Sequence, residues 1–256
     1  MIDVVVPVGP NDRDTAKITA MSIQKNVLDV RTIYIVSHED LHISGTTFIN
    51  ESKLNFKLQD VRTILKVDSR AGWYFQQLIK LYIPTLIPSI LQHYLVVDAD
   101  TFFLRPCRFV EDGRPVFNLG NEFHQPYFDH MQRLFPSLIK PMMYSGITHT
   151  LLYDRRWLND LISLVEEHHK GKIFWKVYLD EVDPDHKEKS GAAENELYFT
   201  YCILAHIRDI TIKSLKWTDI SSIDEINNDL DYVSLHWYRR QSSLDLSSLE
   251  KRVLES

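Results

Sequence analysis

The sequence predicts an α/β protein in which a central, mostly parallel sheet is flanked by helices. Residues 95–97 are a short run of large apolar side chains, which is typical of a strand that helices cover on both faces. Residues 2–8 and 32–37 are rich in β-branched side chains, and the segment between them has the apolar spacing of a helix. This order predicts a β-α-β unit, whose right-handed crossover makes the two strands parallel.

Composition limits the classes of protein to consider. The 256 residues suffice for one large domain, and 44% hydrophobic with 25% charged residues is typical of a globular chain. A net charge of −6 gives no electrostatic reason to expect a nucleic-acid partner. Pro84 and Pro88 interrupt the best candidate for a membrane span. Only Cys107 and Cys202 are available for disulfides and no signal peptide is visible, so we expect a cytoplasmic protein.

The first half of the chain should continue the alternation of strands and helices. We expect a turn over residues 9–12, a helix to about residue 28, a polar loop over 38–55, a third strand over 61–67 and a helix from Gly72. Pro84 and Pro88 should kink or divide this last helix before the strand at 95–97 begins.

The second half is less regular. We expect strands over 115–119, 147–153, 210–215 and 231–235, a short helix and loop over 123–135, and helices over 155–169, 191–207 and 243–254. The helix over 191–207 is apolar on nearly every side, which predicts burial. Residues 170–191 include a strongly charged stretch, and we expect an exposed loop there.

Asp98 and Asp100 are the strongest chemical signal. They directly follow the strand at 95–97, and ligands in open α/β sheets bind outside the carboxyl ends of the strands. Two ionised oxygens close together suit a hard cation. The sequence has no glycine-rich phosphate loop, so a metal held by these aspartates is one way to hold phosphates. Their spacing alone also fits a turn in which aspartate accepts backbone hydrogen bonds.

Other candidate residues have simple alternatives. Glu194 and Glu196 lie in the first turn of a helix, where the helix dipole already favours acids, and only one of the two should face a given cleft. Trp73 could frame a base or a sugar, or pack a helix against the sheet. Lys80 could contact a nucleotide or pair with an acid in the sheet.

Several motifs occur in a characteristic order, at residues 4–9, 72–81, 97–101, 148–155 and 194–198. With them the chain resembles nucleotide-diphospho-sugar transferases of the GT-A type, and more narrowly a group of glycosyltransferases from bacteria and large DNA viruses. The resemblance extends from the first strand to His236. The chain departs from the group at His149, which stands alone where the group has a histidine pair.

The resemblance implies the GT-A fold, a Rossmann-like fold, with the whole chain (1–256) as one domain. Residues 1–105 would form the nucleotide-binding half, 106–240 the acceptor and sugar half, and 241–256 a C-terminal helix. The implied activity moves a sugar from a nucleotide-diphospho-sugar to a hydroxyl of a glycan, glycolipid or glycoprotein. A UDP-sugar is the first expectation for the donor and a GDP-sugar the second.

The resemblance also implies a divalent metal, Mn²⁺ or Mg²⁺, on the donor diphosphate. An Asp-x-Asp pair holds the metal in such enzymes, which here gives Asp100 as a direct ligand and Asp98 near the ribose. A late histidine often completes the metal site, and His236, just past a strand, is the candidate. An imidazole among oxygen ligands suits Mn²⁺ better than Mg²⁺. The metal acts as a Lewis acid that neutralises the leaving diphosphate.

The attacking hydroxyl must lose its proton, and a carboxylate within hydrogen-bond reach can accept it. Glu194 is the first candidate for this base, Glu196 the second and Asp154 the third. A base on the face opposite the leaving group gives inversion, which we favour over retention. The residues expected to contact the nucleotide sugar are Pro7, Val8, Gly9, Asp12, Trp73, Gln76, Gln77, Lys80, Asp98, Ala99, Asp100 and His149.

Three other functions fit parts of the sequence. A phosphatase of the haloacid-dehalogenase type also places Asp-x-Asp after an apolar strand, but needs Thr or Val where this chain has Phe102. A non-catalytic nucleotide- or carbohydrate-binding module would not require Asp98, Asp100, His236 and Glu194 all to be present. A nucleotidyltransferase that makes the sugar nucleotide would need a glycine-rich basic loop after the first strand, which residues 9–13 match poorly.

Overall fold

The structure is a computed structural model that describes residues 1–227, 229–240 and 245–255. Its central sheet consists of β1 (Ile2–Pro7), β2 (Val30–Ser37), β3 (Thr47–Asn50), β4 (His93–Val97) and β8 (Thr150–Asp154). The strand order is β3-β2-β1-β4-β8. All neighbours are parallel except β8, which runs antiparallel to β4. The predicted mixed, mostly parallel sheet is therefore confirmed, as is the β-α-β start.

Two three-stranded sheets accompany the central one. The first has the order β10-β11-β5 and consists of β5 (Thr101–Phe103), β10 (Trp217–Asp219) and β11 (Tyr232–Ser234). The second has the order β6-β7-β9 and consists of β6 (Val110–Glu111), β7 (Arg114–Phe117) and β9 (Thr211–Ile212). Because β5 follows β4 after only three residues, the first small sheet begins at the carboxyl end of the central one.

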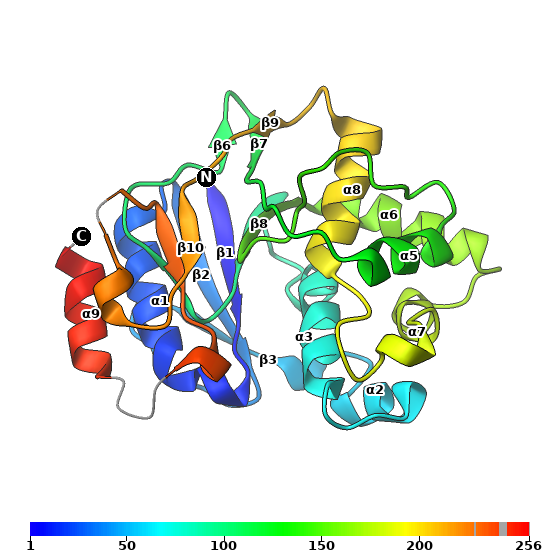
Figure 1. The fold of residues 1–256 in the computed structure, drawn as a ribbon, viewed down its shortest axis with the longest axis horizontal. Coiled ribbons are helices and arrows are strands. Elements are labelled where there is room, and N and C mark those ends of the chain that lie inside the picture. Colours follow the sequence, from blue (N-terminus) through cyan, green and yellow to red (C-terminus); the bar gives the residue numbers. More distant parts are fainter. Residues whose placement is uncertain (228, 241–244, 256) are drawn as a thin grey trace.

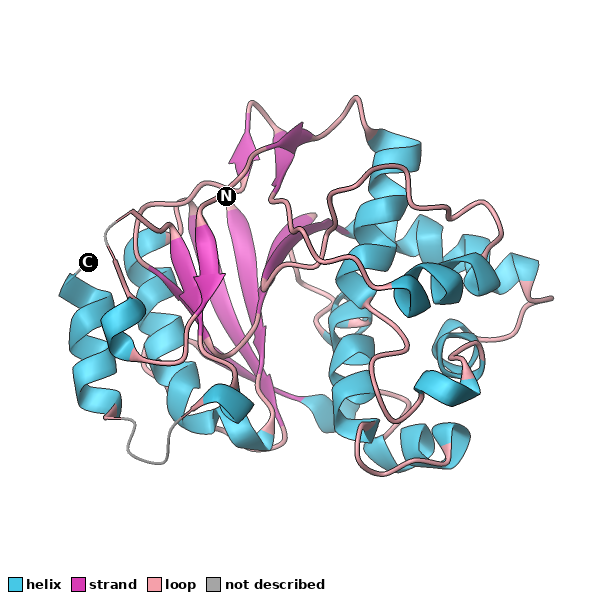
Figure 2. Ribbon diagram, in the orientation of Figure 1, coloured by secondary structure: helices cyan, strands magenta, loops and turns pink. Residues whose placement is uncertain are grey.

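Helices flank the central sheet, as predicted. They are α1 (Arg13–Asn26), α2 (Leu58–Leu65), α3 (Ala71–Leu81), α4 (Ile83–Leu86), α5 (Gln125–Leu134), α6 (Arg155–His168), α7 (Phe174–Asp180), α8 (Glu194–His206) and α9 (Leu246–Glu255). Short 3₁₀ turns cover Pro10–Asp12, Glu51–Lys53, Pro184–His186, Ile223–Glu225 and Trp237–Arg239. In Figure 1, α1 and α9 lie on one side of the strands, and α2, α3 and α5–α8 lie on the other. Figure 2 shows the strands between these two groups of helices.

β1, β8 and most of β4 and β2 are buried because helices cover both sides of the sheet. Every residue of β1 is buried, which explains its continuous apolar run. The one charged residue in β1, Asp3, has no exposed side-chain surface and accepts hydrogen bonds from the Arg31 guanidinium and from the Leu91 backbone N–H. These donors offset the cost of removing its carboxylate from water.

The strand expected over residues 61–67 is wrong, because this segment lies in α2. Val61 and Leu65 are buried four residues apart, which places them on one face of a helix. The Asp60 carboxylate accepts a hydrogen bond from the Lys57 backbone N–H and so caps the first turn. A short apolar run of this length fits a strand or a helix equally well, and the cap decides the outcome.

The two expected loops also contain regular structure. Residues 38–55 include β3, which pairs parallel to β2 at the edge of the central sheet. Residues 170–191 include α7, in which Phe174, Tyr178 and Leu179 are buried. The exposed loop was predicted from the charged residues that follow α7, and the short apolar run of α7 itself was overlooked. The strand expected over 210–215 shrinks to β9, and β10 was not predicted.

The predicted terminal helix is present as α9. Leu249 and Val253 are buried in a cluster with Ile18 of α1, so the helix docks on the body of the molecule. Its expected start at Ser243 lies outside the described residues. Within the described part of the chain, none of the helices combines the length and the apolar character that a membrane span requires.

Candidate functional site

The pairing of β4 with β8 positions the first part of the site. Asp98 directly follows β4, and its backbone N–H donates to the carbonyl of His149, 2.9 Å away. His149 directly precedes β8. The two strands are antiparallel and Val97 lies opposite Thr150, so the residue after β4 lies opposite the residue before β8. The pairing therefore brings the His149 ring beside Asp98, at the carboxyl end of β4.

The small sheet of β5, β11 and β10 positions the second part. Thr101 at the start of β5 lies opposite Ser234 of β11, and Ser234 lies opposite Asp219 of β10. His236 follows Ser234 by two residues, so it reaches the Asp100 carboxylate. Asp219 ends β10 at the same place. Three strand ends thus deliver Asp100, His236 and Asp219 to one point.

Charged side chains form a continuous chain of close pairs through the site, which we call the charged row. Its pairs and closest distances are Glu194–Lys80 2.7 Å, Lys80–Asp98 2.7 Å, Asp98–His149 3.5 Å, His149–Asp219 2.9 Å, Asp219–His236 3.5 Å, His236–Asp100 3.4 Å, Asp100–Arg240 3.6 Å and Arg240–Asp12 2.6 Å. The row contains five carboxylates and two permanent cations, Lys80 and Arg240, and Arg239 lies 3.7 Å from Asp219 at its side. The carboxylates therefore still outnumber the permanent cations, which favours an additional positive charge.

Lys80 of α3 joins the candidate base to the first aspartate. Its buried ammonium lies between Asp98 and Glu194, at hydrogen-bond distance from each. Burial alone would lower the pKa of Lys80, but the two neighbouring carboxylates raise it above its ordinary value. Burial alone would likewise raise the pKa of Asp98, and Lys80 with His149 holds it well below its usual range. Lys80 and Asp98 are thus charged partners at neutral pH.

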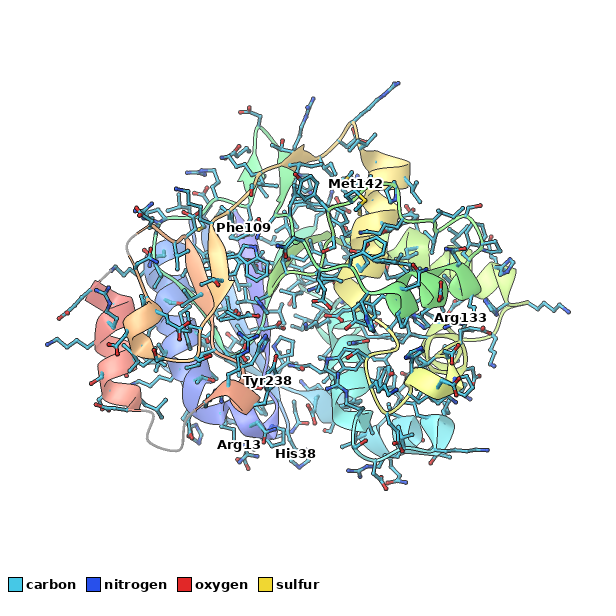
Figure 3. The ribbon with its side chains drawn as sticks, viewed as in Figure 1. Arg13, His38, Phe109, Arg133, Met142 and Tyr238 are labelled. Carbon is cyan, nitrogen blue, oxygen red and sulfur yellow. The ribbon has the colours of Figure 1, made fainter. Side chains whose placement is uncertain are left out.

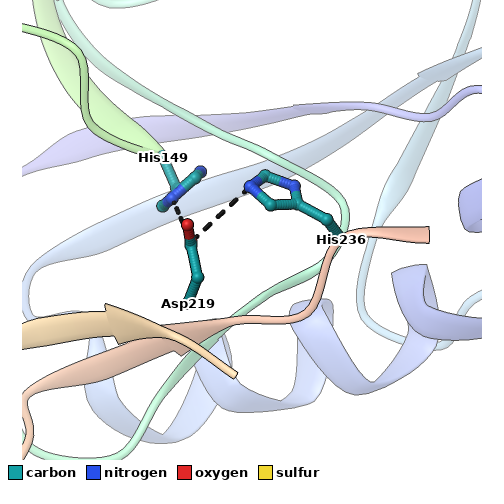
Figure 4. Close-up of side chains that lie close together, drawn as sticks. All are labelled: His149, Asp219 and His236. Carbon is teal, nitrogen blue, oxygen red and sulfur yellow. Dashed lines mark ion pairs between the residues drawn. The ribbon is translucent and has the colours of Figure 1, made fainter. Parts of the chain in front are cut away.

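His149, Asp219 and His236 form a cluster that could hold a metal ion (Figure 4). One ligand atom from each lies within 4.8 Å of the others. Asp219 Oδ1 is buried and lies between the two rings, 2.9 Å from His149 Nε2 and 3.5 Å from His236 Nε2. Two imidazoles and a carboxylate are a donor set that suits a divalent transition metal better than Mg²⁺. Of the predicted metal ligands Asp98, Asp100 and His236, this cluster contains His236.

The charges around the cluster also affect its titration. Burial alone would lower the pKa of His149, but Asp219 and Asp98 raise it to about 9. Burial alone would raise the pKa of Asp219, and His149, His236 and Arg239 lower it. Without a metal, the positive charge in this cluster is therefore a proton on His149.

The far end of the row joins the site to the turn after β1. Arg240 lies 2.6 Å from Asp12 and 3.6 Å from Asp100, and it also donates to the carbonyls of Asn11 and Leu235. Burial and the nearby Asp100 raise the pKa of Asp12, and Arg240 offsets part of this rise. Arg240 thus ties the segment after β11 to the segment after β1.

A small, mostly apolar pocket lies at the carboxyl ends of β1 and β2, beside α3. Four of the expected donor contacts line it, namely Pro7, Val8, Gly9 and Gln76. Arg13 and His38 also line this pocket and lie at one edge of the molecule in Figure 3. Gln76 precedes Lys80 by one helical turn, so the two side chains share a face of α3. The pocket is therefore adjacent to the charged row.

Three other expected donor contacts lie outside this pocket lining. Gln77 donates to the carbonyl of Ala192 and accepts from the Tyr178 hydroxyl, so it joins α3 to α7 and to the segment before α8. Trp73 is covered by the Arg70 guanidinium, 4.2 Å from the ring centre. Ala99 is buried in the turn after β4.

Asp154 is not brought to the charged row. Asp154 is the last residue of β8 and lies opposite His93, the first residue of β4. Because β8 runs antiparallel to β4, the end of β8 lies at the edge of the sheet opposite to Asp98. The Asp154 carboxylate caps α6 by accepting from the Arg156 backbone N–H at 2.8 Å. Burial alone would raise the pKa of Asp154, but hydrogen bonds from His93, Arg156 and Gln92 lower it.

Glu196 also turns away from the charged row. It has no exposed surface and accepts hydrogen bonds from Lys140 Nζ at 2.8 Å and from the Gly146 backbone N–H at 2.7 Å. Burial raises the pKa of Glu196, and its donors offset part of the rise. Glu194 and Glu196 therefore face different surroundings, as their spacing predicts.

Asp219 and Arg240 belong to the site but were not among the predicted residues. Asp219 ends a strand of three residues, which is too short to show a strand period in the sequence. Arg240 lies four residues after His236, beyond the last predicted strand. This position was the one feature of the sequence that could have indicated a site residue there.

Comparisons with known proteins identify a family and a structural similarity. A family model described as "Family of unknown function (DUF6492)" matches residues 11–210. The structure is similar to the crystal structure of mouse xyloside xylosyltransferase 1 in its apo form, with a TM-score of 0.48 and 9% sequence identity. That match covers 94% of this chain and 100% of the other. The search of curated proteins gives no match.

Proposed function

The chain belongs to DUF6492, a family of unknown function, and we propose that it is a metal-dependent glycosyltransferase of the GT-A type. The observation that carries this proposal is the charged row, which lies at the carboxyl ends of the strands beside a small pocket. Ligands of open α/β sheets bind at that edge. The reaction would move a sugar from a nucleotide-diphospho-sugar, UDP before GDP, to an acceptor hydroxyl with inversion.

The pocket and the charged row would bind different parts of the nucleotide sugar. The pocket at the ends of β1 and β2 would hold the flat base of the nucleotide, with residues 1–105 as the nucleotide-binding half and 106–240 as the acceptor half. The diphosphate would extend along the charged row, where Arg240 and Lys80 supply positive charge. The terminal helix, within 241–256, packs away from the row against α1.

Asp98 is paired with Lys80, so we assign His149, Asp219 and His236 as the groups that would bind Mn²⁺ or Mg²⁺. Asp100 lies beside this cluster, 3.4 Å from Nδ1 of His236. The imidazole nitrogens of the cluster favour Mn²⁺. When bound, the ion supplies a Lewis acid that neutralises the leaving diphosphate.

Glu194 is the residue we assign as the general base. Of the three carboxylates considered for this role, it is the one within the charged row, whereas Glu196 and Asp154 are committed to structural hydrogen bonds elsewhere. Lys80 holds the Glu194 carboxylate in place from 2.7 Å. A fixed carboxylate can accept the proton of an attacking hydroxyl.

Thermal unfolding with nucleotides tests the proposal. UDP or GDP should raise the melting temperature in the presence of Mn²⁺ and not in its absence, because a ligand of the native state stabilises by mass action. Asp100→Ala should abolish the shift. Asp229→Ala is the matched control, since Asp229 is 90% exposed and its nearest cation, Arg105, lies 3.8 Å away.

The nucleotide sugar that gives the largest shift is then incubated with a glycan array and Mn²⁺. Transfer with release of the nucleoside diphosphate supports the proposal. The absence of any nucleotide shift with metal present contradicts it. Release of inorganic phosphate without sugar transfer favours a phosphatase instead.

A further inference from the structure

A second pocket opens beside the charged row, away from the pocket at the ends of β1 and β2. Its volume is about 780 Å³, within the range of about 300–1,000 Å³ that small-molecule sites occupy. Among the described residues, the two pockets share no lining residue. The second pocket reaches the metal cluster at Asp219, which is one of its lining residues. A molecule bound there would therefore lie next to the metal cluster.

Trp217 of β10 provides a rigid aromatic surface in this pocket. Its ring stacks on the buried ring of Tyr232, with 5.7 Å between centroids and an interplanar angle of 5°. Its indole N–H donates to the carbonyl of Leu119, and His149 meets it edge to face. These contacts fix the ring, and the part that remains accessible lines the pocket.

Tyr144 provides a second aromatic side chain on a fixed backbone. Its side chain is 56% exposed and lines the pocket. Lys140 Nζ donates to the Tyr144 carbonyl at 2.7 Å and to the buried Glu196 carboxylate at 2.8 Å. Glu196 also accepts from the Gly146 backbone N–H. Glu196 thus anchors the segment that carries Tyr144 from both sides, so this part of the pocket is formed before any ligand binds.

Polar groups complete the lining. Asn121 offers an amide, Thr218 a hydroxyl and Arg239 a guanidinium, all on the lining of the same pocket. An aromatic face beside hydrogen-bonding groups matches a pyranose ring, which has C–H groups on its faces and hydroxyls on its edge. The guanidinium of Arg239 lies 3.7 Å from Asp219 and so connects this lining to the metal cluster.

We infer that this pocket is the acceptor subsite and that it binds a pyranose ring of a glycan against Trp217. The inference rests on the proposed function and narrows it, because it makes the accepting group a sugar hydroxyl rather than a protein or lipid hydroxyl. Glu196 would then be a positioning residue, because it holds the segment that carries Tyr144 and does not itself contact the saccharide.

The test measures saccharide binding without requiring transfer. Methyl glycosides of the common hexoses and hexuronic acids are screened by saturation-transfer NMR with UDP and Mn²⁺ present, and the best binder is titrated. Tyr144→Ala should weaken its binding about fivefold, and Trp217→Ala about tenfold or more, with Trp217→Phe restoring most of the affinity. Phe123→Ala is the matched control, because Phe123 is also 56% exposed but lies outside the lining.

The outcomes separate this inference from the proposed function. Saccharide binding that depends on Tyr144 and Trp217, with the nucleotide shift unchanged in Tyr144→Ala, supports both. Saccharide binding that neither substitution affects overturns the subsite. A nucleotide shift without binding of any saccharide also overturns the subsite and leaves the transferase standing. Saccharide binding at Trp217 without any nucleotide shift supports the subsite and overturns the transferase.

Discussion

Asp219 lies between His149 and His236, and its buried Oδ1 faces a ring nitrogen of each. We therefore expect Asp219→Asn to weaken Mn²⁺ binding about tenfold or more, because a neutral amide is a poorer ligand than a carboxylate between two imidazoles. Isothermal titration calorimetry or the EPR signal of free Mn²⁺ gives the affinity directly, without any activity assay.

Asp229→Asn is the control for this measurement, because it removes the same charge from a carboxylate that is 90% exposed. Equal losses in the two variants would attribute the effect to net charge rather than to ligation. An unchanged affinity in Asp219→Asn would exclude Asp219 from the metal site.

Lys80 makes a different prediction, for stability. Lys80→Met leaves the buried carboxylate of Glu194 and the partly buried carboxylate of Asp98 without their shared cation. Removing one partner of a buried ionic group costs about 3–5 kcal/mol of unfolding free energy. Urea denaturation measures the loss. The double variant Lys80→Met with Glu194→Gln should recover part of the lost unfolding free energy, since one of the two carboxylates left without a cation is then neutral. No recovery would mean that Glu194 contributes little to the pairing.

The sequence identified many of the single residues in the charged row but could not arrange them. Asp98 and Asp100 could be predicted because carboxylates at the end of a buried strand need partners. Asp154 looked equivalent, yet the antiparallel direction of β8 places it at the far edge of the sheet, where it caps α6. Strand direction is a property of the whole sheet, and the local residues do not encode it.

At the scale of elements, the contact between α8 and the segment before β8 leaves no room for a side chain at Gly146. A Cβ there would lie 2.2 Å from Phe199 Cβ and 2.9 Å from the Asn195 carbonyl oxygen. We expect Gly146→Ala to lower the unfolding free energy by about 3 kcal/mol, since overpacked cores force the backbone to shift. Thermal or urea unfolding measures the change.

Gly72→Ala is the matched comparison. Gly72 lies in the first turn of α3, and a Cβ there meets no described atom within 4 Å. Alanine is the better helix former, so this variant should gain up to about 1 kcal/mol. If both variants lose stability equally, the close packing of Gly146 on α8 is not the cause.

Elements were predicted best where the apolar period was long. The helices α1, α6 and α8 lie close to their expected positions, because a stripe over several turns distinguishes a helix from a strand. The short run in α2 does not make that distinction, and the run in α7 was hidden by the charges beside it. β10 has three residues and pairs with a strand that begins 15 residues later, so it carries no local signal.

At the scale of the whole molecule, the site exists because two sheets meet at one edge. The central sheet delivers Asp98 and His149, and the β5-β11-β10 sheet delivers His236 and Asp219. The pairing of β5 with β11 joins segments about 130 residues apart, and such distant contacts are specified by the packing of the complete chain rather than by a local pattern. The sequence could therefore predict where a site lies, but not which late residues complete it.

The acid stability of the whole molecule should depend on His130 of α5. His130 has no exposed surface, and its Nε2 lies 2.9 Å from the Tyr178 carbonyl of α7. Burial lowers the pKa of His130 from 6.5 to about 4, opposed by the Tyr178 carbonyl and reinforced by Arg133. Below pH 6.5 the unfolded chain binds a proton that the folded chain refuses, so stability must fall as the pH drops toward 4.

The comparison of wild type with His130→Gln isolates the contribution of His130 to the pH dependence of the unfolding free energy. His149, whose pKa is raised to about 9, gains stability as the pH falls, but it does so equally in both proteins. Glutamine keeps a donor for the Tyr178 carbonyl and cannot titrate, so the substitution should cost stability at pH 7.5 and about 2 kcal/mol less at pH 5. Urea unfolding at the two pH values gives the difference. A cost that does not change with pH would mean that His130 is protonated as readily in the folded chain as in the unfolded one.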